Sequence, residues 1–192
     1  MPRILITTSH RPAPRSRSFI KDLAAVIPNA IRFTRGKSTF VQLAIAAHDL
    51  GAERVVIVNN RMGNPYTMDV YQLRFVPASA ELFELEKICR LVLRGITLSR
   101  EARNPRPPYR AYAAAYVVHN GAPLSVDAAE CFIRGLMFQA YEASRLTKPF
   151  ITAVMRWRDD FVEAVFRDHR GVRVGPVIRI RRVILCTEHS CA

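Results

Sequence analysis

Residues 54–74 read RVVIVNNRMGNPYTMDVYQLR, a stretch that indicates two strands joined by a tight turn. The β-branched, apolar run at 54–59 is typical of a buried strand. RMGNP at 61–65 has the residue types of a turn, and a second strand is expected over 68–74. The strands and helices before and after this predicted hairpin can then be assigned relative to it.

The segments before the hairpin alternate between strands and helices. Short apolar runs at 4–8 and 30–34 predict two strands. A helix with Ser16 as its candidate N-cap follows the first strand. A second helix is expected to begin at Ser38 and to end at Gly51, a residue suited to the left-handed position after a helix. The order β-α-β-α-β-β predicts an α/β fold with mostly parallel strands.

The rest of the chain has a less regular pattern. Residues 82–93 fit either a helix face or a long strand, with 88–93 favouring a strand. Residues 95–112 have turn chemistry and no apolar period. A helix is expected from Ser125 or Asp127 to about Arg145. Further strands are expected at 113–119, 150–157, 160–166 and 177–185.

The composition points to an anionic partner. The chain has 192 residues, 49% of them hydrophobic, which is enough for a folded core and excludes a disordered basic tail. Its 29 Lys and Arg residues against 16 Asp and Glu residues give a net charge of +13. We count 25 arginines among these cations. Because the planar guanidinium binds phosphate through two hydrogen bonds and stacks on bases, an anionic polymer is the first partner to test.

Several functional classes are disfavoured by what the sequence lacks. No apolar run reaches the roughly 18 to 20 residues of a membrane span, and the start MPRI has no signal-peptide core. We therefore expect a soluble, intracellular protein without membrane contact. There is no P-loop, GxSxG or HExxH motif. We expect no enzymatic activity, no cofactor and no small-molecule substrate.

The spacing of the cysteines gives no sign of a disulfide framework. Cys89, Cys131, Cys186 and Cys191 are widely spaced and contain no CxxC pair, so we expect reduced thiols. Cys186, His189 and Cys191 lie close together in the sequence, but a structural zinc site needs four ligands. No metal is expected.

Basic residues follow three successive predicted strands, and residues 9–21 and 30–48 contain no acid. If the strands are parallel, the loops after them meet at one edge of the sheet, where open α/β sheets generally bind ligands. The two helices also begin at this edge, and helix N-termini favour phosphate. The alternative is a scatter of ordinary surface cations in salt bridges. The candidate RNA-binding residues are Arg11, Arg15, Arg17, Arg35, Lys37 and Arg61.

A second candidate segment is 94–110, in which arginines alternate with aromatic residues. Arginines and tyrosines in a loop suit RNA backbone and exposed bases, although a long loop is also compatible with a mobile excursion. The possible secondary RNA-binding residues are Arg100, Arg103, Arg106 and Arg110, with Tyr109 and Tyr112 beside them. The alternating cations Arg179, Arg181 and Arg182 are interpreted as the solvent side of an edge strand.

The first 75 residues contain a set of short motifs, which are ITTSHRP at 6–12, RSRSFIKDL at 15–23, IPN at 27–29, RGK at 35–37 and GNP at 63–65. Together these motifs resemble the Brix-domain family of ribosome biogenesis proteins, in its short archaeal form. The resemblance covers residues 4–75 most strongly, and His10 departs from it where an arginine is typical.

The resemblance implies a factor that binds ribosomal RNA precursor directly and assists rRNA processing and subunit assembly without catalysis, with other assembly proteins as further partners. It also implies a single Brix-type domain over 1–192, with an N-terminal half at 1–76 and a C-terminal half at 77–192. The halves would be similar α/β units with mixed, mostly parallel sheets, each resembling the anticodon-binding domain of class IIa aminoacyl-tRNA synthetases. The residues alone leave two alternatives open, an RNA-processing nuclease and a basic adaptor that docks an acidic partner.

Overall fold

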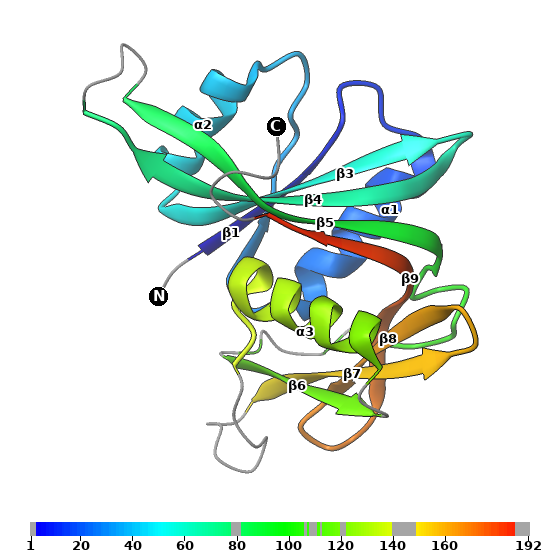
Figure 1. Cartoon of the computed structure of the whole chain (residues 1–192). Coiled ribbons are helices and arrows are strands. Elements are labelled where there is room, and N and C mark those ends of the chain that lie inside the picture. The colour runs from blue at the N-terminus through cyan, green and yellow to red at the C-terminus, as the bar shows by residue number, and fades with distance from the viewer. Residues whose placement is uncertain are drawn as a thin grey trace.

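The computed structural model describes residues 3–77, 82–105, 107, 111, 113–119, 122–139 and 149–186. The predicted order β-α-β-α-β-β at the start of the chain is confirmed (Figure 1). None of the helices in these ranges is long and apolar enough to cross a membrane. In chain order the elements are β1 (Arg3–Thr8), α1 (Pro14–Val26), β2 (Ala30–Arg32), α2 (Phe40–Asp49), β3 (Ala52–Arg61), β4 (Asn64–Phe75), β5 (Phe83–Thr97), β6 (Ala113–His119), α3 (Pro123–Leu136), β7 (Phe150–Arg158), β8 (Phe161–Asp168) and β9 (Arg173–Leu185).

The nine strands form one mixed sheet in the order β2-β1-β3-β4-β5-β9-β8-β7-β6. β1 runs parallel to β2 and β3, and β6 runs parallel to β7. The other five pairings of described strands are antiparallel, so the expectation of mostly parallel sheets is wrong. The physical reason is that short connections, such as Met62 with Gly63, join successive strands, and short connections produce antiparallel neighbours.

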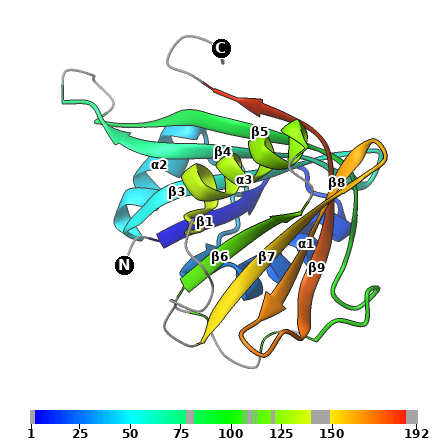
Figure 2. The same cartoon turned by 60° about the horizontal axis from the view of Figure 1, so that its bottom comes forward.

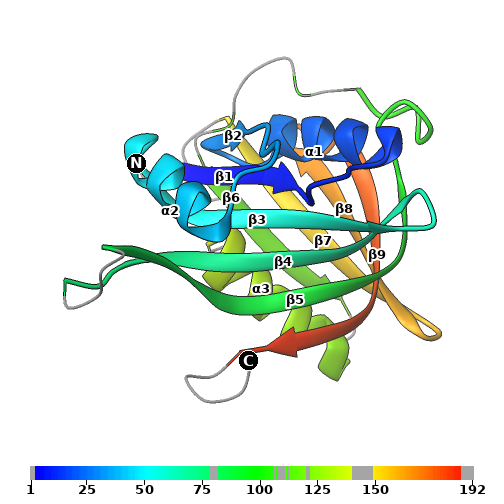
Figure 3. The same cartoon turned by 90° about the horizontal axis from the view of Figure 1, so that it is seen from above.

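The sheet is strongly curled around α1 and α3 (Figures 2 and 3). Ile4 and Ile6 of β1 belong to the large core shared with these two helices, whereas Leu5 belongs to a smaller core with α2. Since successive side chains of a strand point to opposite faces, α2 lies on the outer face of the sheet. α1 therefore sits inside the curve, with its N-terminus at the end of β1.

Both helices of the first part begin at a residue other than the predicted cap. α1 begins at Pro14, and Ser16 lies buried inside its first turn; proline is preferred at the first helical position because its φ is already helical. α2 is capped by Thr39 rather than by Ser38. Thr39 and Gln42 form a reciprocal capping box, which a glutamine three residues after the cap makes possible.

α3 is shorter than predicted, because it ends at Leu136 rather than near Arg145. Met137 adopts a left-handed conformation with a φ of 58°, and the Phe138 N–H donates to the carbonyl oxygen of Phe132. The chain then pairs with β6 through the Gln139 N–H. The remainder of the predicted helix, residues 140–145, lies outside the described residues.

The ambiguous segment at 82–93 belongs to the long strand β5, which continues to Thr97. β5 pairs with both β4 and β9 and thus lies in the middle of the sheet.

Cys89 of β5 forms a disulfide with Cys131 of α3, so the expectation of reduced thiols is wrong for this pair. α3 packs directly on β5 and brings the two Cα atoms to 6.0 Å, a proximity that 42 residues of sequence separation conceal. Cys186 is disulfide-bonded as well. The other members of the C-terminal cluster, His189 and Cys191, lie outside the described residues.

Candidate nucleic-acid interface

The loops that follow β1, β2 and β3 lie together at one edge of the sheet, as the parallel strand order predicts. The Ser9 N–H donates to the carbonyl oxygen of Val58 at 3.0 Å, and Ser9 Oγ donates to Asn60 Oδ1 at 3.2 Å. His10 Nδ1 lies 3.3 Å from the carbonyl oxygen of Gly36. We call these loops, residues 9–13, 33–39 and 61–63, together with the first turn of α1, the basic edge.

Three of the predicted cations at the basic edge face solvent. Arg11, Arg17 and Lys37 are exposed, and none of them forms an ion pair with an acid among the described residues. The Arg17 side chain donates to the carbonyl oxygen of Pro12 at 3.3 Å. Arg17 and Arg32 also line a small groove of about 130 Å³ between the first and second loops. Arg32 was not among the sequence candidates, since it lies within a predicted strand.

Arg35 is placed differently, with only 6% of its surface exposed. Its guanidinium carbon lies 4.9 Å from the centre of the Phe40 ring, and its Nε donates to the carbonyl oxygen of Ser38. Burial lowers the pKa of Arg35, against an opposing contribution from Tyr71. The side chain holds the turn that leads into the capping box of α2.

Arg15 joins the basic edge to the second candidate segment. It donates to both carboxylate oxygens of Glu101, at 2.5 and 2.7 Å. Burial of Glu101 by itself raises the pKa of this carboxyl, but hydrogen bonds from Arg15 and from the Leu98 N–H outweigh burial and lower it. Because β5 runs in the same direction as β3, the loop that follows β5 lies at the same edge as the loops after β1, β2 and β3. Two segments that the sequence left separate thus form one surface.

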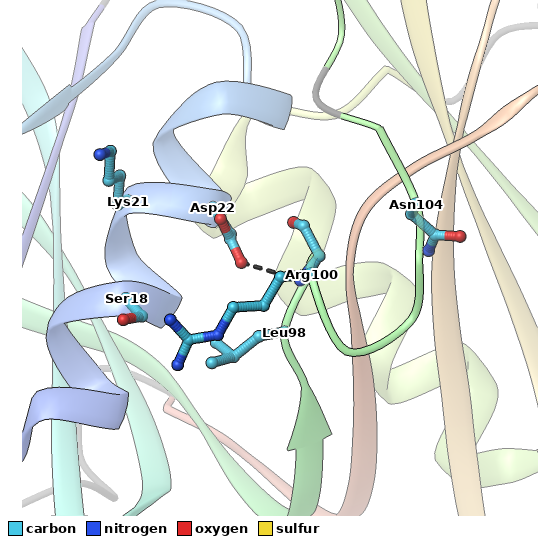
Figure 4. A pocket seen from close by; sticks show the side chains of 7 residues that line it. Ser18, Lys21, Asp22, Leu98, Arg100 and Asn104 are labelled. Carbon is cyan, nitrogen blue, oxygen red and sulfur yellow. Dashed lines mark hydrogen bonds between the residues drawn. The ribbon is translucent and has the colours of Figure 1, made fainter.

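A pocket of about 360 Å³ lies between α1 and this loop (Figure 4). Arg100 extends from the loop toward Ser18 of α1, and Lys21 lies on the following turn of the helix. Sequence reasoning did not single out Lys21, although its spacing of four residues from Arg17 places both on one helix face. The lining residues are Ser18, Lys21, Asp22, Leu98, Ser99, Arg100 and Asn104.

The other secondary candidates are only partly described. Arg103 is exposed and adopts a left-handed conformation with a φ of 54°. Arg106 and Arg110 lie outside the described residues, as do Tyr109 and Tyr112. Of the secondary set, Arg100 is the residue that lines the pocket.

Arg61 leads from the basic edge onto the outer face of the sheet. The guanidinium carbons of Arg61 and Arg181 lie 5.3 and 5.4 Å from the centre of the Tyr66 ring. Arg181 also donates to the Tyr66 hydroxyl at 2.8 Å, and hydrogen bonding from Arg61 is the largest of the influences that lower the pKa of Tyr66.

The arginines of β9 do not lie on an edge strand. β9 pairs with β5 on one side and with β8 on the other, so the interpretation of Arg179, Arg181 and Arg182 as edge protection is wrong. A strand period of two shows which face a side chain occupies, but not which strands flank it. Arg181 and Arg182 are exposed cations on an interior strand.

A curated protein of Aeropyrum pernix, named a probable Brix domain-containing ribosomal biogenesis protein, is 34% identical to this chain over 175 residues. The match covers 91% of this chain and 93% of that protein. No protein-family model matches the chain.

Solved structures share the fold. One is the crystal structure of a probable ribosomal biogenesis protein from Aeropyrum pernix K1. Its sequence is 34% identical, the match covers 95% of this chain and 97% of that one, and the two structures superpose with a TM-score of 0.82. Mil, an archaeal Imp4-like protein, is 19% identical, covers 95% and 99% of the two chains, and gives a TM-score of 0.65. With a relative 34% identical over nearly the whole of both chains, this chain belongs to the Brix-domain family of ribosomal biogenesis proteins.

Proposed function

We propose that this chain is a ribosome biogenesis factor that binds ribosomal RNA precursor and assists rRNA processing and subunit assembly without catalysis. The observation that carries the proposal is the meeting of exposed Arg11, Arg17 and Lys37 at one edge of the sheet. Cations gathered without acid partners attract a polyanion. The relatives named as ribosomal biogenesis proteins supply the kind of RNA. Other assembly proteins are expected partners, and the cytoplasm is the proposed location.

The bound RNA would run along the basic edge and continue past Arg61 to the outer face. Arg11, Arg17 and Lys37 contact phosphates in this proposal, whereas Arg15 and Arg35 position the loops that carry them. Beyond Arg61, the stacked side chains of Tyr66 and Arg181 offer flat surfaces to an unpaired base. This arrangement favours single-stranded or looped RNA over a regular duplex.

The proposal includes one Brix-type domain over 1–192 made of two related halves. In the first half, one parallel pairing is followed by two antiparallel pairings across the strands β1, β3, β4 and β5. The second half has the same order of pairings, one parallel and then two antiparallel, across the strands β6, β7, β8 and β9. This repetition supports a boundary between the end of β5 and the start of β6 instead of the one at 76 and 77. Superposing each half on an anticodon-binding domain tests the likeness that the family resemblance implies.

The test of the RNA-binding surface removes three charges at a time. In an Arg11→Gln/Arg17→Gln/Lys37→Gln variant, affinity for single-stranded ribosomal RNA fragments should fall. The slope of log K against log salt should become shallower by about two, because each phosphate contact on a single strand contributes about 0.7. Fluorescence anisotropy at a series of salt concentrations measures both quantities.

The matched control removes the same charge at the opposite ends of the strands. Arg3 and Arg54 stand at or near the starts of β1 and β3, and Arg134 lies near the end of α3, where its carbonyl oxygen accepts from Arg54. An Arg3→Gln/Arg54→Gln/Arg134→Gln variant should keep the original salt slope. Equal losses in both triple variants would mean that overall charge, and not the basic edge, binds RNA.

Two further measurements separate the proposal from its alternatives. Labelled RNA incubated with the protein, with and without divalent metal, should remain intact, and reproducible cleavage would favour a nuclease. An adaptor would hold an acidic protein through the same cations, so RNA would compete with that protein for the basic edge.

A further inference from the structure

The pocket between α1 and the loop 98–104 has a rigid floor. The Ser99 N–H donates to Asp22 Oδ2 at 2.9 Å, and the Asn104 N–H donates to the carbonyl oxygen of Ser99 at 3.0 Å. Asn104 also reaches β9 through the carbonyl oxygen of Gly175 at 3.1 Å. These bonds fix the loop against both α1 and β9. Binding of a ligand in the pocket would therefore cost little free energy for ordering the loop.

One polar atom in this pocket lacks a protein partner. Ser99 is 4% exposed, and its Oγ has no hydrogen-bond partner among the described residues. A buried hydroxyl without a partner costs about 1 to 3 kcal/mol, so such a group in a native protein generally meets a ligand or a water. Ser99 differs from the other two unpartnered serines, Ser16 and Ser125, because it lines a pocket, whereas they lie buried in the first turns of α1 and α3.

The charges around the pocket favour an anion. Lys21 and Arg100 line it, and neither forms an ion pair with an acid among the described residues. The acid of this loop, Glu101, forms an ion pair with Arg15. The buried carboxylate of Asp22 sits deeper, where it repels an anion but accepts hydrogen bonds from hydroxyl groups. The pocket is thus cationic at its mouth and polar at its floor.

We propose that this pocket binds a ribonucleotide, with the phosphoryl group between Lys21 and Arg100 and the ribose hydroxyls toward Ser99, Asp22 and Asn104. The volume of about 360 Å³ is of the size that small-molecule sites have, and larger than one phosphate needs. Lys21 lies one helical turn from Arg17, so the pocket continues the line of cations along α1. The inference rests on the proposed RNA-binding function, and it adds a defined site for one nucleotide.

The phosphoryl group can come from an RNA chain or from a free nucleotide, and calorimetric titrations distinguish these sources. The probes are adenosine 5′-monophosphate, adenosine, and a ten-nucleotide RNA without terminal phosphates. A Lys21→Gln/Arg100→Gln variant should lose about tenfold in affinity for any probe that uses the pocket, because it removes two charge-assisted contacts. A loss for the monophosphate indicates a free nucleotide, and a loss confined to the RNA indicates a chain phosphate.

The controls separate the pocket from general charge. Arg3→Gln removes one exposed cation at the start of β1, far from the pocket, and should change affinity by less than about twofold. Ser99→Ala leaves every cation in place and should weaken pocket binding by about threefold or more. Melting temperatures of the variants verify that each one is folded.

The outcomes keep the two proposals apart. If the Arg11, Arg17 and Lys37 variant loses RNA while the Lys21 and Arg100 variant binds every probe normally, the pocket proposal fails and the RNA-binding function stands. If the wild-type protein binds no RNA but binds the monophosphate through Lys21 and Arg100, the pocket proposal stands and the RNA-binding function fails. Equal binding of adenosine and its monophosphate, together with an unchanged RNA affinity in the Lys21 and Arg100 variant, would also overturn the pocket proposal.

Discussion

Arg15 of α1 and Glu101 of the loop after β5 form a bidentate ion pair, although they are 86 residues apart in the sequence. Arg15 also donates to the carbonyl oxygen of Ile96 at 3.2 Å, and the Leu98 N–H donates to Glu101. These contacts join the first turn of the helix to the end of a central strand. The cations of α1 and of the loop are therefore held in one fixed arrangement.

Replacing Arg15 by alanine should lower the free energy of unfolding by about 0.5 to 1 kcal/mol. The side chains of Arg15 and Glu101 are 33% and 32% exposed, so solvent screens the pair and the loss stays small. Urea denaturation measures it. Arg17→Ala is the matched control, since Arg17 lies two residues away and forms no ion pair with an acid among the described residues. An equal loss there would contradict a specific role for the ion pair.

The contribution of Glu101 should disappear in acid. Its pKa is lowered in the folded state, although burial alone would raise it, whereas an unfolded glutamate titrates near about 4.3. The stabilisation is therefore complete above that pH and is lost as the pH falls through the folded pKa. The difference in unfolding free energy between the wild type and Glu101→Gln should be constant from about pH 7 to 5 and shrink below about pH 4. A difference that grows in acid would refute this assignment.

Gly135 permits α3 to approach β4 closely. A Cβ atom at this position would lie 2.7 Å from Cγ1 of Val70, whose side chain is fully buried. Gly135→Ala should therefore cost about 1 to 3 kcal/mol through overpacking, despite the better helix propensity of alanine. Thermal unfolding measures the change. Adding Val70→Ala should make the Gly135→Ala exchange far less costly, and an unchanged cost would show that the two residues do not clash.

The Cys89–Cys131 disulfide should stabilise the oxidised protein. Cys131→Ala is expected to lower its unfolding free energy by about 2 to 4 kcal/mol, because the bond closes a loop of 42 residues. Reduction should then cost the variant less than the wild type. Peptide mapping after alkylation of the unreduced, denatured protein should find the two cysteines linked, and finding both alkylated would rule the bond out.

The first part of the fold follows from local patterns. Apolar runs and turn residues place β1, α1, β2, α2, β3 and β4 in the correct order. Cap positions differ, since Pro14 and Gln42 decide them more strongly than the serines. Sheet order was not predictable, because the pairing of β5 with β9 joins strands about 90 residues apart and leaves no local signal. The disulfide was hidden for the same reason.

The basic edge could be predicted because parallel strands bring their following loops together. The individual roles of its cations could not, since Arg11, Arg15 and Arg35 look alike in sequence. Only packing separates exposed Arg11 from Arg15, held by Glu101, and from Arg35, buried against Phe40. The pocket depends on the loop after β5 meeting α1, which is again a long-range contact.

The place of β9 between β5 and β8 affects how the chain acquires its fold during synthesis. Among the described strands β9 is the last to leave the ribosome, yet it lies inside the sheet, between β5 and β8. Until it arrives, β5 and β8 both present unpaired backbone edges, and such edges can pair with other chains. The sheet closes only when this arginine-bearing strand inserts, so a nascent chain would need protection until that final step.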